Sequence, residues 1–338
     1  MNCRSKLVYA VAVLNLHACL PADTRPEPGR VFVTASLVSG LNSKDITFIT
    51  GDGWTVRLQN LFISVGNVEL GPDRDCNDYS FANYSRILSF REAGRQKVAQ
   101  VWGLNECTLN LGTEKPDAED GVLGKGVPDS ERSLMATATV PVAYTDESNP
   151  TSKVKEYRGM AMHVLGTIER GAVSVDFNWG FTDIVTLFDC QRKVNGVLES
   201  VLPLKGGQTI NVNISIEPRN LFFAVPSGDN VTSGAEGQPS VGSESELGGS
   251  RQSSTGTLTS AEGATSLVQL IVDAYQVNGN RNGLVDIEEL TRMKVGGFTN
   301  NLGEVLRLFS YPSMFIFDDG GQCSLSSSLE RGRGRGHE

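Results

Sequence analysis

The sequence is poor in histidine and has no cluster of basic residues in its body. It contains three histidines in 338 residues, and only His163 lies between the N-terminal segment and the C-terminal tail. This scarcity excludes a histidine-rich metal site. A Ser–His–Asp triad would have to use His163, and the sequence has no Gly-x-Ser-x-Gly elbow. The formal net charge of −9 argues against nucleic acid as a partner, because phosphate binding needs clustered lysine and arginine.

Long hydrophobic runs are also missing after the first residues, so no later segment has the length of a transmembrane helix. The N-terminus differs, because Arg4 and Lys6 precede an apolar stretch from Leu7 to Leu16. A positive segment followed by a short apolar one is typical of a secretory signal peptide, which we predict over residues 1–18. We therefore expect the protein to be exported.

The signal peptide runs into Leu16-His17-Ala18-Cys19, which resembles a bacterial lipobox. The resemblance implies cleavage before Cys19 and a lipid on that cysteine, whose acyl chains would hold the protein on a membrane. Leu20, in place of aspartate, implies the outer membrane of a bacterial cell envelope, facing the periplasm or the cell surface. His17 departs from the small residue usual in a lipobox, and ordinary secretion with an incidental Cys19 is the alternative.

Six cysteines occur in the sequence, and two of them belong to the signal peptide and the lipobox. The other four are expected to form disulfides, because an exported chain matures in an oxidising compartment. Four cysteines allow three pairings, of which we predict Cys76–Cys107 and Cys190–Cys323. A zinc site is the rival interpretation, but no two cysteines have Cys-x-x-Cys spacing.

Apolar and polar residues alternate along much of residues 30–225, as in half-buried strands. The clearest run consists of Val173, Val175, Phe177, Trp179 and Phe181. Similar runs occupy residues 31–37 and 210–216, and a further run begins at Trp54. Gly66-Asn67 breaks the phase of that last run, as a bulge or turn would. We predict a mainly β fold, an antiparallel β-sandwich or barrel-like domain over 30–225, preceded by a short tether over 19–29.

Two segments are predicted to have little regular structure. Residues 114–156 are rich in proline and glycine and short of apolar runs, so we expect a long excursion. Residues 226–262 consist mostly of glycine, serine, threonine and glutamate, so we expect a disordered linker.

The C-terminal part has helical periodicity. Apolar residues recur on one stripe over 266–277 and again over 301–310, and residues 314–317 are typical of a final strand. We predict that residues 263–323 form a helix, an EF-hand-like loop, a second helix and this strand. Residues 324–338 are predicted to be a disordered tail.

The segment 278–289 resembles the EF-hand calcium loop. That motif has six oxygen ligands, which here would come from Asn278, Asn280, Asn282, the carbonyl of Leu284, Asp286 and Glu289. Gly283 falls at the sharp turn. Only two of the six are carboxylates, so the resemblance implies weak, structural calcium binding with a dissociation constant of about 10⁻⁴–10⁻³ M. The alternative is a loop that keeps the turn and binds nothing.

Met160, Met162 and His163 are close enough in sequence to suggest a copper site. On a strand, alternation would put both methionines on one face and His163 on the other. The three side chains could then not bind one ion, and we predict that the methionines belong to the core.

Several segments resemble a family of uncharacterised bacterial envelope lipoproteins. They are residues 52–56, 62–68, 97–98 and 103–107, the strand end at Cys190 and the EF-hand-like loop. The resemblance covers most of residues 45–323 and implies no activity. A more distant similarity is to periplasmic copper-binding proteins of the MbnP type, although the missing histidines count against copper.

These observations predict a lipid-anchored envelope protein that acts as a non-catalytic binding or structural module. Its partners would be the membrane, through Cys19, and an unknown protein or small-molecule ligand. One alternative is an envelope hydrolase, in which carboxylates, or His163 with a serine, converge in a cleft. The other is a periplasmic copper-handling protein.

Overall fold

The protein is described from a computed structural model. The described residues are 26–71, 75–119, 121–146, 149–199, 202–222, 251–252, 267–278, 284–291, 293, 295, 301–318 and 321–328. The signal peptide, the lipobox, most of the predicted linker and most of the predicted tail lie outside them.

The fold is mainly β, with a small helical element near the C-terminus, as predicted. The strands are β1 (Gly29–Leu37), β2 (Ile46–Ile49), β3 (Thr55–Gly71), β4 (Asn77–Asp78), β5 (Arg86–Ser89), β6 (Gln96–Thr113), β7 (Val122–Leu123), β8 (Thr139–Asp146), β9 (Asn149–Arg158), β10 (Met162–Arg170), β11 (Val173–Phe181), β12 (Ile184–Val194), β13 (Val197–Glu199), β14 (Leu202–Leu204), β15 (Thr209–Ile216), β16 (Arg251–Gln252), β17 (Leu284–Val285), β18 (Phe315–Phe317) and β19 (Gln322–Ser328). The helices are α2 (Asp129–Thr137), η1 (Pro218–Leu221), α3 (Leu267–Asn278), α4 (Ile287–Thr291), α5 (Leu302–Val305), the π-helical η3 (Leu306–Ser310) and α6 (Tyr311–Ser313).

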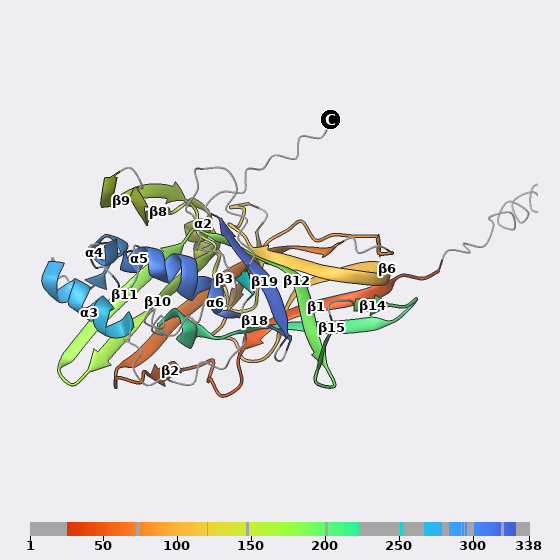
Figure 1. The fold of residues 1–338 in the computed structure, drawn as a ribbon, viewed down its shortest axis with the longest axis horizontal. Helices are drawn as coiled ribbons and strands as arrows, with labels where there is room; N and C mark the ends of the chain where they lie inside the picture. The colour runs from red at the N-terminus through yellow and green to blue at the C-terminus, as the bar shows by residue number, and fades with distance from the viewer. Residues whose placement is uncertain are drawn as a thin grey trace, which may run out of the picture.

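Two long strands, β3 and β6, organise the sheet. The first half of β6 pairs with β1, which pairs on its other edge with β15 in parallel. The second half of β6 pairs with β3 and β12. The first half of β3 lies between β2 and β10, and β10 continues to β11. Because both strands change partners along their length, the sheet curls around its core (Figure 1).

A bulge interrupts β3 where the sequence predicted one. The register between β3 and β6 shifts between Gly66 and Glu69. Asn67 has a φ of 50°, in the left-handed region that asparagine tolerates better than most residues. The bulge lets one strand serve two neighbours, because it resets which side chains face inward.

The predicted alternation is confirmed in the core. Three residues of β1 are fully buried: Val31, Val33 and Ala35. Arg30, which directly precedes Val31 in the same strand, faces solvent. Trp179 of β11 packs against Phe177 and Phe222, with ring centroids 4.6 and 6.0 Å away. Tilted aromatic pairs of this kind add to the free energy gained from burial alone.

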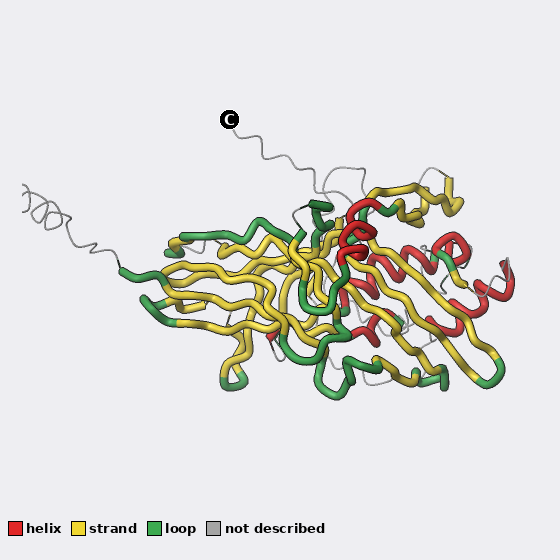
Figure 2. The backbone as a smooth tube through the Cα atoms, turned by 180° about the vertical axis from the view of Figure 1, so that it is seen from behind, coloured by secondary structure: helices red, strands yellow, loops and turns green. Residues whose placement is uncertain are grey.

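The prediction of an irregular excursion over 114–156 is wrong. This segment contains α2 and the hairpin of β8 and β9, which is a separate two-stranded sheet (Figure 2). Together they cover a second apolar cluster that includes Phe62, Met135, Val140 and Met160. Apolar residues are sparse along this segment. Helix α2 and the β8–β9 hairpin therefore depend on contact with the rest of the cluster for their stability.

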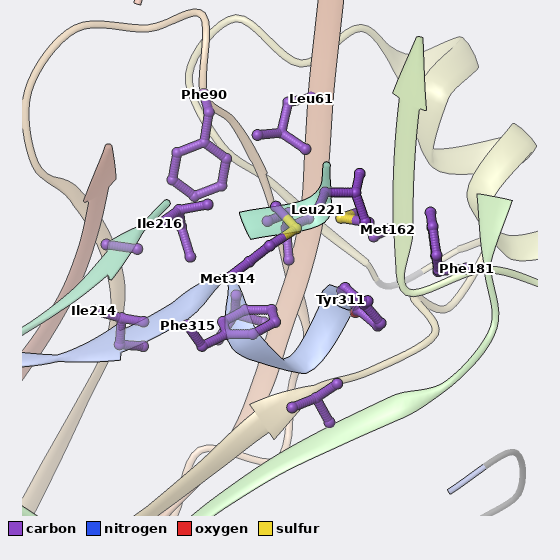
Figure 3. Packing of buried hydrophobic residues seen from close by; sticks show 14 of the residues in the cluster. Leu61, Phe90, Met162, Phe181, Ile214, Ile216, Leu221, Tyr311, Met314 and Phe315 are labelled. Atoms are coloured by element: carbon purple, nitrogen blue, oxygen red, sulfur yellow. The ribbon is translucent and has the colours of Figure 1, made fainter. Parts of the chain in front are cut away.

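The C-terminal element closes the other side of the core. Helices α3 and α4 and the α5–η3–α6 segment confirm the predicted helices, and β18 and β19 follow. Tyr311, Met314 and Phe315 enter the core beside Leu61 and Phe181 (Figure 3). The predicted tail begins too early, because residues up to Ser328 belong to β19, which pairs with β12. That strand has serine at alternate positions, so its pattern lacks the usual hydrophobic signal.

Both predicted disulfides are present. Cys76–Cys107 joins the segment before β4 to β6, and Cys190–Cys323 joins β12 to β19. The second bridge ties the C-terminal strand to the curled sheet across 133 residues of chain.

Candidate functional site

The described part of the EF-hand-like segment has the predicted order of elements. Helix α3 ends at Asn278, β17 covers Leu284 and Val285, and α4 begins at Ile287. Strand β17 pairs in parallel with β11, and Trp179 donates a 3.1 Å hydrogen bond to the carbonyl of Val285. The loop's exit is therefore attached to the sheet. Asn280 and Asn282 lie outside the described residues.

Asp286 and Glu289 cap the start of α4. The backbone N–H of Glu289 donates to Asp286 Oδ1 at 2.9 Å, and the backbone N–H of Asp286 donates to Glu289 Oε2 at 3.2 Å. This reciprocal arrangement is a capping box, which satisfies N–H groups that the helix itself leaves without partners. The two predicted carboxylate ligands therefore lie about one helical turn apart at the start of α4. Among the described residues, no three His, Cys, Asp or Glu side chains form a metal-binding group.

His163 forms a buried polar cluster that the sequence did not reveal. Its Nδ1 lies 2.6 Å from Glu131 Oε1, and its Nε2 lies 2.7 Å from Asn178 Oδ1. Burial alone would lower the pKa of His163, but the hydrogen bond to Glu131 and the negative charge there outweigh it and raise that pKa above 6.5. With oxygen atoms facing both nitrogens, the protonated ring donates two hydrogen bonds. Among the residues that the structure describes, no serine takes part in this cluster, and both nitrogens are engaged.

The two methionines near His163 do not share a face, contrary to the prediction. Met162 belongs to the main core, whereas Met160 lies in the second apolar cluster. The strand begins only at Met162, and Gly159 has a φ of 78°, so strand alternation does not extend back to Met160. Both sulfur atoms therefore serve packing in different parts of the core.

A second buried ion pair joins the turn between β11 and β12 to η3. Arg307 donates a 2.7 Å hydrogen bond to Asp183, whose side chain is fully buried. Burial raises the pKa of Asp183, although the Arg307 charge opposes this shift. Nothing in the local sequence pattern marks either residue, because 124 positions separate them.

One cavity opens where β3, β6, β12 and β19 meet. Its volume is about 250 Å³, and it is lined by Asn67, Glu69, Asn110, Leu111, Gly112, Thr113, Ile184, Thr186, Phe188 and Ser326. Glu69 and Asn110 face each other across β3 and β6, just after the bulge at Asn67. Among the described residues that line the cavity, Glu69 is the only one with an ionisable side chain. The cavity therefore offers one carboxylate, two amides and several hydroxyls beside an aromatic ring.

A cavity of this size lies just below the usual range of ligand sites, which is about 300–1,000 Å³. Its lining suits a small molecule that donates hydrogen bonds through hydroxyl or ammonium groups. Acid–base hydrolysis would need a second positioned acid or base, and Glu69 is alone here. Sequence reasoning missed this site because its residues come from four strands. The sequence signal at this site is limited to alternation: Glu69 and Asn110 each lie between two apolar residues, which predicts that they face outward from their strands.

No protein-family model, curated protein or solved structure matches this chain. The resemblances to envelope lipoproteins and to MbnP-type proteins therefore stay predictions. Within the described part of the chain, no helix has the length and hydrophobicity needed to cross a membrane.

Proposed function

We propose that this chain is an exported, lipid-anchored envelope protein that binds a small polar ligand without transforming it. The observation that carries the proposal is the cavity around Glu69, in which one carboxylate stands among amides and hydroxyls. Such a lining orients a ligand through hydrogen bonds and lacks the paired groups of acid–base catalysis.

Export is supported by the two disulfides, because bridges of this kind persist in oxidising compartments. The lipid would be attached to Cys19, and the outer membrane of a bacterial envelope is the proposed location. Labelling of the full chain with an alkyne fatty acid tests the anchor. Wild-type protein should take up the label and Cys19→Ser should not.

The hydrolase alternative is less well supported. His163, the catalytic candidate in that interpretation, has Glu131 and Asn178 against its two ring nitrogens. Its side chain is buried, with about 6% exposed. These contacts favour a structural role for His163.

A calcium ion in the EF-hand-like loop is part of the proposal, as a stabilising ion. Support comes from the order α3, β17, α4 and from Asp286 and Glu289 lying one helical turn apart at the start of α4. The attachment of β17 to β11 would carry the ion's effect into the sheet.

Ligand binding is tested by calorimetric titration of the mature chain with glucose, N-acetylglucosamine and ethanolamine. The proposal expects binding of at least one probe. Replacing Glu69 with Gln should abolish binding of ethanolamine and weaken that of a sugar. Glu106→Gln is the control, because Glu106 is exposed and lies outside this cavity. Equal binding by the Glu69→Gln variant, or no binding of any probe, would overturn the assignment.

A further inference from the structure

The solvent face of the sheet formed by β15, β1 and the first half of β6 carries only positive charge. Arg30 and Lys97 are its charged residues in these strands. The other outward residues that are not buried are Phe32, Thr34, Ser36, Gln100, Trp102, Thr209 and Asn211. This distribution stands out in a chain with a net charge of −9.

The two cations are arranged around one aromatic ring. The Arg30 guanidinium lies 5.7 Å and the Lys97 ammonium 5.8 Å from the centre of the Phe32 ring. Arg30 is paired with Trp102 across β1 and β6. Basic and aromatic side chains are thus interleaved on one surface.

The aromatic character continues onto the segment after β4. The backbone N–H of Tyr79 donates to the carbonyl of Trp102 at 3.0 Å, which places the two residues side by side. Tyr79 is 54% exposed and Phe81 is 65% exposed, so neither ring is used in the core. Asp78, the acidic residue of β4, accepts a hydrogen bond from the backbone of Ser80. We call Arg30, Phe32, Lys97, Trp102 and Tyr79 the basic–aromatic face.

The strands that carry this face, β1, β6 and β15, extend to the end of the molecule where β1 begins (Figure 1). Strand β1 starts at Gly29, and Arg30 is its second residue. Segment 19–26 can span at most about 25 Å even when fully extended. A lipid on Cys19 would therefore hold this end of the sheet close to the membrane surface.

We propose that the basic–aromatic face rests on an anionic phospholipid surface. Lysine and arginine are attracted to anionic headgroups, and tryptophan and tyrosine favour the interface between headgroups and acyl chains. The orientation rests on the lipid anchor of the proposed function, whereas the affinity of the face for lipid does not. None of the residues of this face lines the cavity around Glu69, so contact with the bilayer would not occupy that cavity.

The experiment uses the mature chain with Cys19→Ser, which carries no lipid, and the fluorescence of its tryptophans. Trp54 and Trp179 are buried, so Trp102 is the tryptophan that responds to the surroundings. Vesicles that contain phosphatidylglycerol should shift its emission to shorter wavelength, and brominated lipids should quench it. Vesicles of phosphatidylcholine alone should have a much smaller effect.

The double variant Arg30→Gln, Lys97→Gln should bind anionic vesicles about thirtyfold more weakly, because each removed charge counts for about fivefold. Lys193→Gln, which changes an exposed lysine on β12, is the matched control and should bind as wild type does. Thermal melts should show that all three proteins are folded.

Three outcomes would overturn the proposal. They are no binding to anionic vesicles, equal weakening by Lys193→Gln, and binding without quenching by brominated lipid. The last would show that the protein reaches the vesicle through a surface other than the basic–aromatic face. Failure of the fatty-acid labelling would refute the lipid anchor of the proposed function. The vesicle experiment uses protein without a lipid, so its result would still test the basic–aromatic face, and the two proposals can fail separately.

Discussion

Arg307 Nη1 lies 2.7 Å from Asp183 Oδ1, and the Asp183 side chain has no exposed surface. The pair joins the turn between β11 and β12 to the π-helical segment η3. Ser327 of β19 also donates to the same Asp183 oxygen, at 3.4 Å. One carboxylate therefore connects three elements that meet only in the folded chain.

Removing Arg307 should destabilise the protein strongly. Arg307→Met leaves a buried carboxylate without its cation, and losing one partner of a buried pair costs about 3–5 kcal/mol. The double variant with Asp183→Asn should recover part of that loss. Urea unfolding measures the free energy of unfolding of the single and the double variant. Lys125→Met, which breaks an exposed pair with Glu92, should cost no more than about 1 kcal/mol. A loss that small for Arg307→Met would contradict the structural role of the pair.

Stability should depend on pH through His163. Its pKa in the folded protein is raised above 6.5, so protonation favours the folded state. That contribution is complete below the pKa of the unfolded chain and is lost as pH rises through the folded pKa. Denaturant unfolding across this range should therefore show stability falling above pH about 6.5. Glu131→Gln removes the charge that raises the pKa and should flatten this dependence. An unchanged profile in that variant would assign the pH effect to other groups.

The longer disulfide should contribute more stability than the shorter one. Cys190–Cys323 closes 133 residues and Cys76–Cys107 closes 31, and the loss of chain entropy in the unfolded state grows with loop length. Replacing both cysteines of the longer bridge with serine should cost about 2–5 kcal/mol. The matched pair Cys76→Ser, Cys107→Ser should cost less. The reverse order in guanidinium unfolding would show that strain or residual structure dominates.

Calcium should raise the melting temperature of the mature chain, and a chelator should lower it. Asp286→Asn separates the two roles of this side chain, because asparagine is as good a helix N-cap as aspartate but brings no charge to an ion. The variant should match the wild type in chelator and lose most of the calcium response. Asp286→Ala should cost about 1 kcal/mol even in chelator, because the cap is lost. Elemental analysis should find calcium in the wild type, and no metal with no chelator effect would exclude the site.

Local pattern was sufficient for much of the fold. Alternation along β1, β11 and β15, the phase break at Gly66-Asn67 and the apolar stripe of α3 were all readable, because each depends on neighbours within a few residues. The disulfide pairing was one of three choices, and the structure confirms it. The hairpin of β8 and β9 escaped prediction because its stability comes from covering a second cluster assembled from distant residues.

The sequence by itself determined the alternating strands of the curled sheet, the C-terminal helices and the supply of cysteines, since these follow from periodicity and composition. Only the tertiary structure decided that Glu131 meets His163, that Arg307 meets Asp183, and that four strands meet around Glu69. Contacts of that kind join residues far apart in the chain, and a polar side chain looks the same in sequence whether it faces water or a buried partner. The curl of the sheet, set by two strands that change partners, brings these side chains together.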